Sequence, residues 1–529
     1  MASLKVLNAL HEVDYHAPTE GPPAPTGQEA EALFESEKAL AAAANIIKKK
    51  TALLQARHVS HLKRLSYLES VVSEKDRIIR QREVLVSKLV SGFCAVAPLN
   101  ASRSDGPLRA SVSIVIPVRN GGDRLRRCLD RISRQKKVDR VELIVIDSGS
   151  ADGSVDVAKS HGAKVIQIPS ESFNHGATRQ LGVHHASGEY VVYTVDDVVP
   201  SSDYWLFKVV AAFEANSDLS VITARQLITE DADLYSRWAN ETGYEAYGLT
   251  ADTKYSMTSP DLFDLLPVPM KRRMSFVDDV CACYRKESLL RYGFASLANG
   301  EDVDIGARMA RAGERLGFLN TAGVYHWHSD GPAYFLKRNY NGAKTFVDVL
   351  ADELPNFETL CVSSVDDILR KSWVLYHTIR LALLEWEPGA EARLDDIGVF
   401  LGRFNDVVEH YQCRMKKVTE DAGGDSDMRA LLEALSGKTL VTTTEGNHFR
   451  YNHLILNFSE DLRRFLGYCI ERRGSMRINK EAFGDVLFKI ASAVIGNALG
   501  YWYMHLKKCG HGEEMSRVDL ALAKGVCFR

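Results

Sequence analysis

The chain has 529 residues and a formal net charge of −3; 45% of its residues are hydrophobic and 26% are charged. This length exceeds what one compact core usually holds, so we expect two to four domains. The composition is that of an ordinary globular protein, and the near-neutral charge excludes the strongly basic class of nucleic-acid-binding proteins.

Cysteine usage and the N-terminus predict an intracellular environment. The nine cysteines are an odd number scattered from Cys94 to Cys527, which indicates reduced thiols in a cytosolic protein. The one close pair, Cys281 and Cys283, lacks the second pair that a zinc site needs. The opening MASLKVLNALHEVDYH has no charged segment followed by an apolar core and a cleavage site, which argues against secretion.

The first hundred residues divide into two segments. Residues 1–29 are rich in proline and glycine at their C-terminal end and predict a disordered lead-in. The stretch 30–100 predicts a helical region, with apolar residues repeating every seven positions at Leu65, Val72, Ile79 and Val86. A second heptad series is interrupted at His61, Lys75 and Arg82. The pattern fits an oligomerising coiled coil, which would make a homo-oligomer, and it equally fits a long helix or hairpin folded on its own chain.

Strand and helix patterns alternate over the next hundred residues. We expect strands over 111–117, 141–147, 163–169 and 189–197, and helices over 123–135, 150–162 and 175–188. This alternation predicts a parallel, doubly wound α/β sheet. Such a sheet binds its ligands beyond the carboxyl ends of its strands.

Four polar clusters follow these expected strands. They are Pro117–Asn120, Asp147–Ser150, Phe173–Gly176 and Asp196–Asp197. Because the carboxyl ends of parallel strands share one edge, a single composite site explains four such clusters better than four unrelated surface turns.

The acidic residues of these clusters suggest specific chemistry. Asp196 and Asp197 are adjacent and would repel each other unless a cation or donor groups neutralise them, and a hard divalent cation that bridges diphosphate oxygens meets that need. An ordinary Asp-rich turn is the alternative. Asp147 precedes small residues, so a flat base could lie against the backbone while the carboxylate accepts from a ring N–H. Plain turn chemistry, with Ser150 or Asp152 capping the next helix, is compatible with this.

A second group of candidate residues lies between positions 301 and 328. Glu301 and Asp302 begin an expected helix that runs to about Ala312, at the end where carboxylates are stabilised. His326 and His328 end the following short strand, two positions apart and therefore on one face. A neutral imidazole there could complete a metal shell begun by Asp196, or both histidines could simply bond nearby backbone.

The chain from 360 to 529 predicts a mostly α-helical domain without a catalytic constellation. Its most apolar stretch, 486–506, is interrupted by Lys489, Asn497 and two glycines, so a buried helix fits better than a membrane span. Cys509 and His511 lack two further ligands, which favours a solvated turn over a metal site.

Taken together, the motifs resemble a known family. SIVIPVRN, IDSGSADGS, TVDD and GEDVDIGARMARAG, in this order, resemble family 2 glycosyltransferases with the GT-A fold, a doubly wound, Rossmann-like mixed sheet. FNHGATRQLG followed by GEYVVYTVDDVVP is similar to the bacterial rhamnosyltransferase branch. The resemblance covers about residues 110–345. It implies a GT-A domain over 108–350, between the helical region 30–100 and the α-helical C-terminal domain 360–529.

The resemblance assigns roles to residues that match the family motifs. It implies a nucleoside pocket, a diphosphate and sugar site, a metal site and a catalytic pair. The implied nucleoside pocket contains Pro117, Arg119 and Asp147, and the implied diphosphate and sugar site contains Asn174, His175 and Arg179. The implied metal ligand is Asp196, with Asp197 as helper and His326 (less so His328) as second ligand. Asp302 is the implied general base, beside Glu301. At the FNHG corner, Gly176 would let the backbone turn close to the ligand, and the following helix would offer free N–H groups to phosphate.

The implied activity is an inverting, metal-dependent sugar transfer from a nucleoside-diphosphate donor to a glycan or lipid-linked glycan acceptor in bacterial surface polysaccharide synthesis. Mg²⁺ or Mn²⁺ would be the cofactor. dTDP-rhamnose is the leading donor, with UDP- and GDP-sugars open. No nucleic-acid partner is expected, and the location would be cytoplasmic, with peripheral association at the inner membrane through a partner or a lipid-linked acceptor.

Three departures keep alternatives open. Thr194 replaces the first carboxylate of a D-x-D motif, Asp197 replaces a small residue, and Gln180 replaces an asparagine. A non-catalytic glycosyltransferase-like scaffold subunit of a glycan assembly complex is one alternative. A nucleotidyltransferase with its phosphate loop at PVRNGGDRLRR is another.

Overall fold

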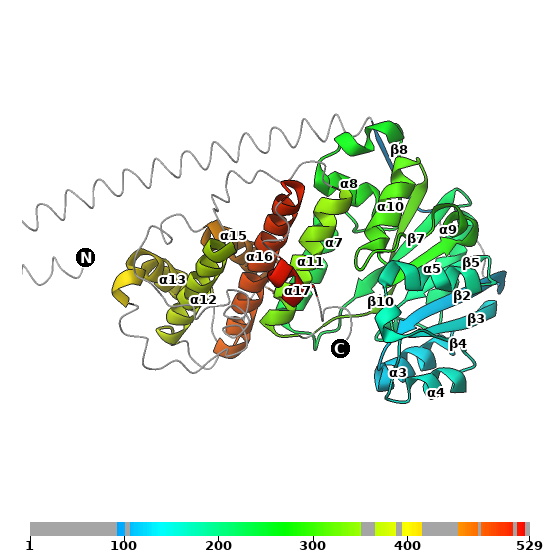
Figure 1. The fold of residues 1–529 in the computed structure, drawn as a ribbon, viewed down its shortest axis with the longest axis horizontal. Coiled ribbons are helices and arrows are strands. Elements are labelled where there is room, and N and C mark those ends of the chain that lie inside the picture. The colour runs from blue at the N-terminus through cyan, green and yellow to red at the C-terminus, as the bar shows by residue number, and fades with distance from the viewer. Residues whose placement is uncertain are drawn as a thin grey trace, which may run out of the picture. The chain divides into compact units, whose positions relative to one another are not determined.

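A computed structural model describes residues 93–100, 106–328, 330–350, 365–387, 394–414, 453–473, 478–510 and 516–523. The predicted disordered lead-in and almost all of the predicted coiled-coil region lie outside these residues. The described chain comprises a mixed α/β part and a helical part (Figure 1).

The α/β part is built on one ten-stranded sheet, ordered β1-β8-β10-β7-β9-β5-β2-β3-β4 with β6 paired to β10. Its strands are β1 (Cys94–Pro98), β2 (Leu108–Val118), β3 (Val138–Asp147), β4 (Lys164–Gln167), β5 (Tyr190–Thr194), β6 (Val199–Pro200), β7 (Leu219–Leu227), β8 (Thr253–Met257), β9 (Cys281–Arg285) and β10 (Arg315–Tyr325). The four strands expected from the sequence are β2, β3, β4 and β5, and they pair in parallel.

The sheet is mixed because β6 and β8 pair antiparallel with β10 and because a central strand, β9, also runs the other way. β9 pairs antiparallel with both β5 and β7, and its first residue, Cys281, lies opposite Thr194 at the end of β5. The start of β9 therefore meets the same edge as the ends of β2, β3, β5 and β7. A purely parallel sheet, which strand–helix alternation alone predicts, is wrong at this point, and the mixed GT-A sheet is confirmed.

Helices cover both faces of the sheet (Figure 1). On one face, side chains such as Ile114 and Val192 pack with α3 (Gly122–Ile132), α4 (Ser154–Ser160) and α6 (Trp205–Ala215). The opposite face contacts α5 (His175–His185), where a Cβ on Gly182 would lie 2.5 Å from Val115 Cγ1. Strand residues alternate between these two layers, as the period of two in a β-strand requires.

The remaining elements of the α/β part connect the strands, except α11, which follows the last strand. They are η1 (Ser170–Ser172), α7 (Leu234–Ala246), η2 (Pro260–Leu265), α8 (Val268–Met274), α9 (Lys286–Tyr292), α10 (Glu301–Arg311) and α11 (Pro332–Leu350). The observed α10 agrees with the helix expected from Glu301 onward. α10 carries Glu301 and Asp302, and α7 and α11 border a cavity.

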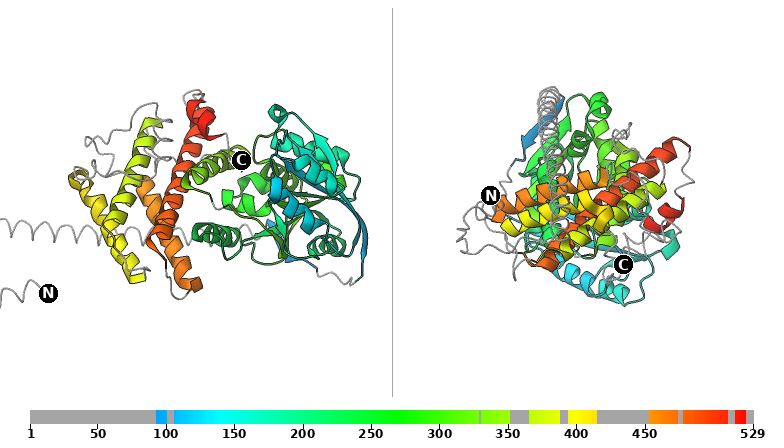
Figure 2. Two further views of the ribbon diagram at one scale, coloured as in Figure 1. Left: turned by 90° about the horizontal axis from the view of Figure 1, so that it is seen from below. Right: turned by 90° about the vertical axis from the view of Figure 1, so that its left-hand side faces the viewer.

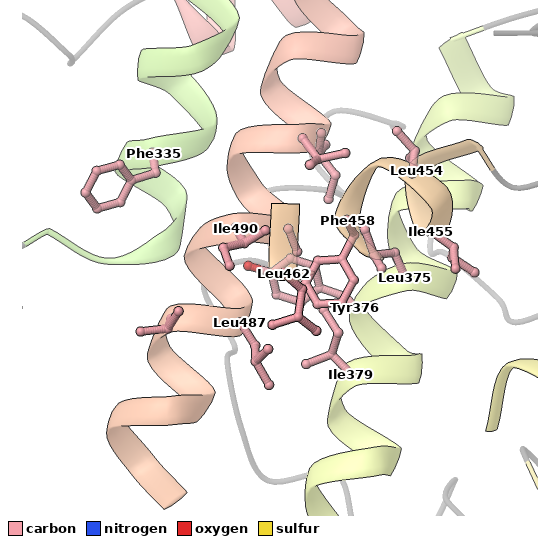
Figure 3. Packing of buried hydrophobic residues seen from close by; sticks show 14 of the residues in the cluster. Phe335, Leu375, Tyr376, Ile379, Leu454, Ile455, Phe458, Leu462, Leu487 and Ile490 are labelled. Carbon is pink, nitrogen blue, oxygen red and sulfur yellow. The ribbon is translucent and has the colours of Figure 1, made fainter. Parts of the chain in front are cut away.

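The helical part consists of α12 (Val365–Leu384), α13 (Leu394–Arg414), α15 (His453–Arg473), α16 (Lys480–Lys508) and α17 (Ser516–Leu522). Figure 2 shows these helices, yellow to red, from two further directions. Leu375, Phe458 and Leu487 come from three of them and meet in one buried cluster, shown in Figure 3. Phe335 of α11 belongs to the same cluster, so this core joins α11 to the helical part.

Two glycines set the contact between α11 and α16. A Cβ on Gly496 would lie 2.2 Å from the carbonyl oxygen of Leu336, and one on Gly500 would lie 2.5 Å from that of Tyr340. Close approach of the two helices therefore requires glycine at both positions. α16 is long and apolar enough to cross a membrane by length and composition, but 72% of its apolar window is buried inside the protein, as the sequence predicts.

Candidate active site

The end of β3 places Asp147 at the rim of the sheet. Its side chain is 1% exposed and accepts hydrogen bonds from the backbone N–H groups of Gly149 and Ser150, at 3.3 and 3.2 Å. The next loop is tied to the end of β2, because Asn120 N–H donates to Ser150 Oγ and Asn120 Oδ1 accepts from Ala151 N–H. Pro117 and Arg119 lie half-buried on the same stretch. The first two rim clusters therefore form one connected wall.

Asp196 follows β5 and faces the turn after β2. Its Oδ2 atom lies 3.6 Å from Arg124 and would be 2.8 Å from a Cβ on Gly121, and it accepts no hydrogen bond within the described residues. Burial and the neighbouring charge of Asp197 raise the pKa of Asp196 to about 6. A buried carboxylate oxygen without a donor is suited to binding a cation or a ligand donor.

Asp197 lies with two histidines that follow β10. One ligand atom from each of Asp197, His326 and His328 lies within 4.8 Å of the others, and His326 Nε2 is 3.4 Å from Asp197 Oδ1. Burial opposes ionisation of Asp197, but the hydrogen bond with His326 and the charges of both histidines lower its pKa to about 2. An ionised carboxylate beside two imidazoles is a set of side chains that can hold a divalent cation.

The sequence favours Asp196 with His326 as the metal pair, whereas the structure groups Asp197 with both histidines. Both residues lie in the turn after β5, and their side chains point in different directions. Asp196 faces Arg124 and Gly121, and Asp197 faces His326.

A hydrogen-bonded chain behind His326 orients its ring. Nδ1 of His326 lies 2.8 Å from Gln226 Oε1, and Gln226 Nε2 donates to Asp278 Oδ2. Because the amide oxygen only accepts, Nδ1 carries a proton, and Nε2 points toward Asp197. Nε2 donates to the carboxylate when the ring is protonated and would offer its lone pair to a cation when the ring is neutral. An outer partner that fixes a histidine tautomer in this way is usual behind metal ligands.

Arg179 is buried, with 5% of its surface exposed, and does not face an open cleft. Its guanidinium lies 2.6 Å from Glu301 Oε1 and 3.0 Å from Asp279 Oδ2. Although burial opposes its charge, these carboxylates hold the pKa of Arg179 above its usual value. The sequence predicts that Arg179 faces the diphosphate and that Glu301 acts beside the general base. In the structure the two side chains form an ion pair with each other.

Asp302 lies beside this network at the start of α10. Burial, followed by the charges of Glu301 and Asp278, raises the pKa of Asp302 to about 7. Oδ1 accepts from the N–H of Val303, and the side chain remains partly exposed. A partly exposed carboxyl that titrates near neutrality meets the requirement for a general base.

The FNHG corner packs against the chain itself. Gly176 N–H donates to Leu297 O at 3.1 Å, and a Cβ on Gly176 would lie 1.7 Å from Ala295 O. Asn174 Oδ1 caps α5 by accepting from Ala177 N–H. The expected free N–H groups for phosphate are thus partly used inside the protein, and Gly176 serves close packing. His175, 3.1 Å from Arg179, has a pKa lowered to about 4, mainly by burial.

Sequence reasoning did not assign roles to three residues that the structure brings to this site. Gln226 is the penultimate residue of β7, and Asp278 and Asp279 precede β9. The adjacent acidic pair inside the apolar run SFVDDVCACY is the one sequence signal that pointed to them. Residues before a strand lie at this edge only when the strand is antiparallel, and the sequence does not show the direction of β9.

The α/β part of the chain is similar in sequence to known proteins. Residues 113–293 match the family Glycosyl transferase family 2. The O-antigen chain rhamnosyltransferase RfbN of Salmonella typhimurium is 26% identical over 236 residues, which are 44% of this chain and 70% of that protein. The O-antigen chain rhamnosyltransferase WbaN of Salmonella anatum is 24% identical over 44% of this chain and 70% of its own length.

Among solved structures, a mannosyltransferase of Pyrobaculum calidifontis in complex with GDP-Man and Mn²⁺ aligns with a TM-score of 0.36. It is 17% identical and the alignment covers 48% of this chain and 68% of that one.

The mixed sheet, with acidic residues at one edge, has the architecture of the GT-A fold. Residues 113–293 match the family 2 glycosyltransferases, and the sequence of the α/β part is similar to bacterial O-antigen chain rhamnosyltransferases.

Proposed function

We propose that this protein is a divalent-metal-dependent, inverting glycosyltransferase that moves a sugar from a nucleoside diphosphate to a glycan acceptor in bacterial surface polysaccharide synthesis. The observation that carries the proposal is the cluster of Asp197, His326 and His328, which lies at the same sheet edge as Asp147. Asp302, whose pKa is raised to about 7, lies nearby at the start of α10. Similarity to two O-antigen chain rhamnosyltransferases supports the polysaccharide role and makes dTDP-rhamnose the first donor to test.

Donor binding follows from the rim wall. Asp147 would accept a hydrogen bond from the base, and Pro117 and Arg119 would border the nucleoside. Asp197, His326 and His328 would hold Mn²⁺ or Mg²⁺, with Asp196 on the diphosphate side. The bound cation would stabilise the charge that develops on the leaving diphosphate.

Transfer would be a single displacement. The acceptor oxygen forms a bond to the anomeric carbon while the bond from that carbon to the diphosphate breaks, and the acceptor proton passes to Asp302. Arg179 and Glu301 would act as positioning residues: Arg179 neutralises Glu301, so that the charge beside Asp302 is limited. Inversion at the anomeric carbon follows from one displacement.

Asp302→Asn tests the chemistry, with Asp304→Asn as the matched control on the same helix. Asp304 pairs with Arg308 at 2.7 Å, one turn along the helix. We expect Asp302→Asn to lower transfer by about 10²–10⁴-fold with nucleotide binding retained, and the control to stay within about twofold of wild type. Transfer rates in both variants, measured with a donor chosen from dTDP-, UDP- and GDP-sugars by thermal shift, decide the outcome. Wild-type turnover in Asp302→Asn contradicts the assigned base.

A further inference from the structure

A cavity of about 230 Å³ lies beside the metal-ligand cluster and is bordered by α7 and α11. His326 and His328 belong to both the cluster and the cavity wall. At roughly 30 Å³ per water, the cavity has the space of about eight water molecules, which suits one sugar ring better than an extended chain. The other lining residues are Gln226, Ile228, Tyr235, Ser236, Ala239, Asn240, Trp327, Phe335, Arg338 and Asn339.

The lining combines aromatic rings with carboxamides. Tyr235, Trp327 and Phe335 supply flat apolar faces, on which the C–H face of a pyranose packs. Asn240 and Asn339 supply groups that both donate and accept, as sugar hydroxyls do, whereas the amide of Gln226 already bonds His326 and Asp278. Arg338 is the single Lys or Arg in the lining, and it is exposed. This chemistry favours a neutral polyhydroxyl ligand over a nucleotide or a polyphosphate.

The carboxamides are held in place with hydrogen-bonding capacity to spare. Asn240 Nδ2 donates to Gln226 O at 3.3 Å, and Asn339 Nδ2 donates to Phe335 O at 2.8 Å. Each bond uses one of the two donors of its amide and fixes the orientation of the group. Among the described residues, no hydrogen bond ends on either amide oxygen, so both remain for a ligand.

The helical part fixes the cavity wall through a buried cation. Lys489 of α16 is 3% exposed and lies 3.3 Å from Asp233 Oδ1, while its ammonium is 5.5 Å from the centre of the Phe335 ring. Asp233 caps α7 through Ser236 N–H, and the Ser236 hydroxyl lies 2.7 Å from Asp233 Oδ2 and 3.0 Å from His328 O. Both sides of the cavity are thus pre-organised.

We propose that this cavity is the subsite for the acceptor saccharide, holding one neutral sugar ring whose attacking hydroxyl reaches the donor beside His326 and His328. The assignment rests on the proposed function. It gives the helical part a role in acceptor recognition, because α16 anchors α11 and α7 through Gly496 and Lys489.

Ala239→Trp tests the subsite. Ala239 is exposed and lines the cavity, so an indole there occupies its mouth without removing a hydrogen-bonding group. Ala246→Trp makes the same substitution two turns further along α7 at an exposed position outside the lining. With the full chain, a donor that it hydrolyses and methyl glycosides of hexoses and 6-deoxyhexoses as acceptors, the ratio of transfer to donor hydrolysis should fall at least tenfold in Ala239→Trp. The control should keep the wild-type ratio.

Saturation-transfer NMR with the same glycosides supplies a readout that needs no donor. We expect glycoside signals with wild type and Ala246→Trp and their loss with Ala239→Trp. Equal signals in both variants, or no glycoside bound by wild type, would overturn the subsite. Glycoside binding in a wild-type protein that neither hydrolyses nor transfers any donor would contradict the proposed function while supporting the subsite.

Discussion

The pKa of Asp302 is raised because its carboxyl is buried and lies near the charges of Glu301 and Asp278. Arg179 offsets part of this negative charge, but Glu301 and Asp279 already engage it. The same crowding of carboxylates that weakens an acid makes it a stronger base. Asp302 would therefore be a more effective proton acceptor than an exposed carboxylate.

The raised pKa of Asp302 gives the activity a pH dependence. We expect kcat to rise with pH through about 7, because the deprotonated form accepts the proton, and the rise to be absent from the residual activity of Asp302→Asn. The folded-state pKa lies above the unfolded value of about 3.9, so the native state binds the extra proton between these values. The contribution of Asp302 to stability falls as pH rises through that window. Asp302→Asn should therefore be more stable than wild type at pH 8 in urea unfolding, and a less stable variant would contradict this.

Gln226 is expected to control metal affinity without touching the metal. Gln226→Leu removes the acceptor that keeps the proton on His326 Nδ1 and leaves Asp278 without its amide donor. We expect the Kd for Mn²⁺ to rise by about 10–100-fold, measured by calorimetry. Thr229→Val, two residues beyond the end of β7 and bonded to the exposed Asp231, serves as the control and should bind Mn²⁺ as wild type does. Unchanged affinity in Gln226→Leu would contradict the orienting role of Gln226 behind His326.

Among the elements, β9 decides how the site is assembled. Its antiparallel direction brings Asp278 and Asp279 to the edge where parallel strands end. Alternating strand and helix patterns predict β2 to β5 from sequence because each pattern is local. The direction of β9 depends on its partners β5 and β7, distant in sequence, and no local pattern encodes it.

The contact between α11 and α16 sets the stability of the helical part. Gly496→Ala places a methyl group against the Leu336 carbonyl, and we expect the free energy of unfolding to fall by about 1–3 kcal/mol in urea titrations. Gly484→Ala lies on the same helix with its nearest neighbour, a Leu383 methyl, at 3.4 Å. This control should be neutral or more stable by up to about 1 kcal/mol, since alanine favours helix. Equal effects at both positions would rule out the close contact.

At the scale of the whole molecule, α11 links the rim to the helical part. It begins shortly after His328, borders the cavity and contributes Phe335, Leu336 and Tyr340 to the helical core. The sequence predicts the helical character of this region. It does not show the contact, because residues such as Lys489 and Asp233 are 256 positions apart and each alone resembles an ordinary surface charge.

The predicted site residues divide according to the range of their interactions. Asp147, Asp196, Asp197 and His326 lie at strand ends, where local patterns place them, and the structure brings them to one edge. Arg179 shows where sequence alone is insufficient. From sequence alone, an arginine near the edge of the sheet could pair with a diphosphate or with carboxylates of the protein. The fold shows that Arg179 pairs with Glu301 and Asp279.

Calorimetric titration of the full chain with a nucleoside diphosphate, with and without Mn²⁺, tests the central claim most directly. We expect wild type to bind at least tenfold more tightly with Mn²⁺, and Asp197→Ala and His326→Ala to bind equally weakly in both conditions. Nucleotide affinity that is the same with and without Mn²⁺ in the wild-type protein would contradict a metal-dependent transferase site at this edge of the sheet.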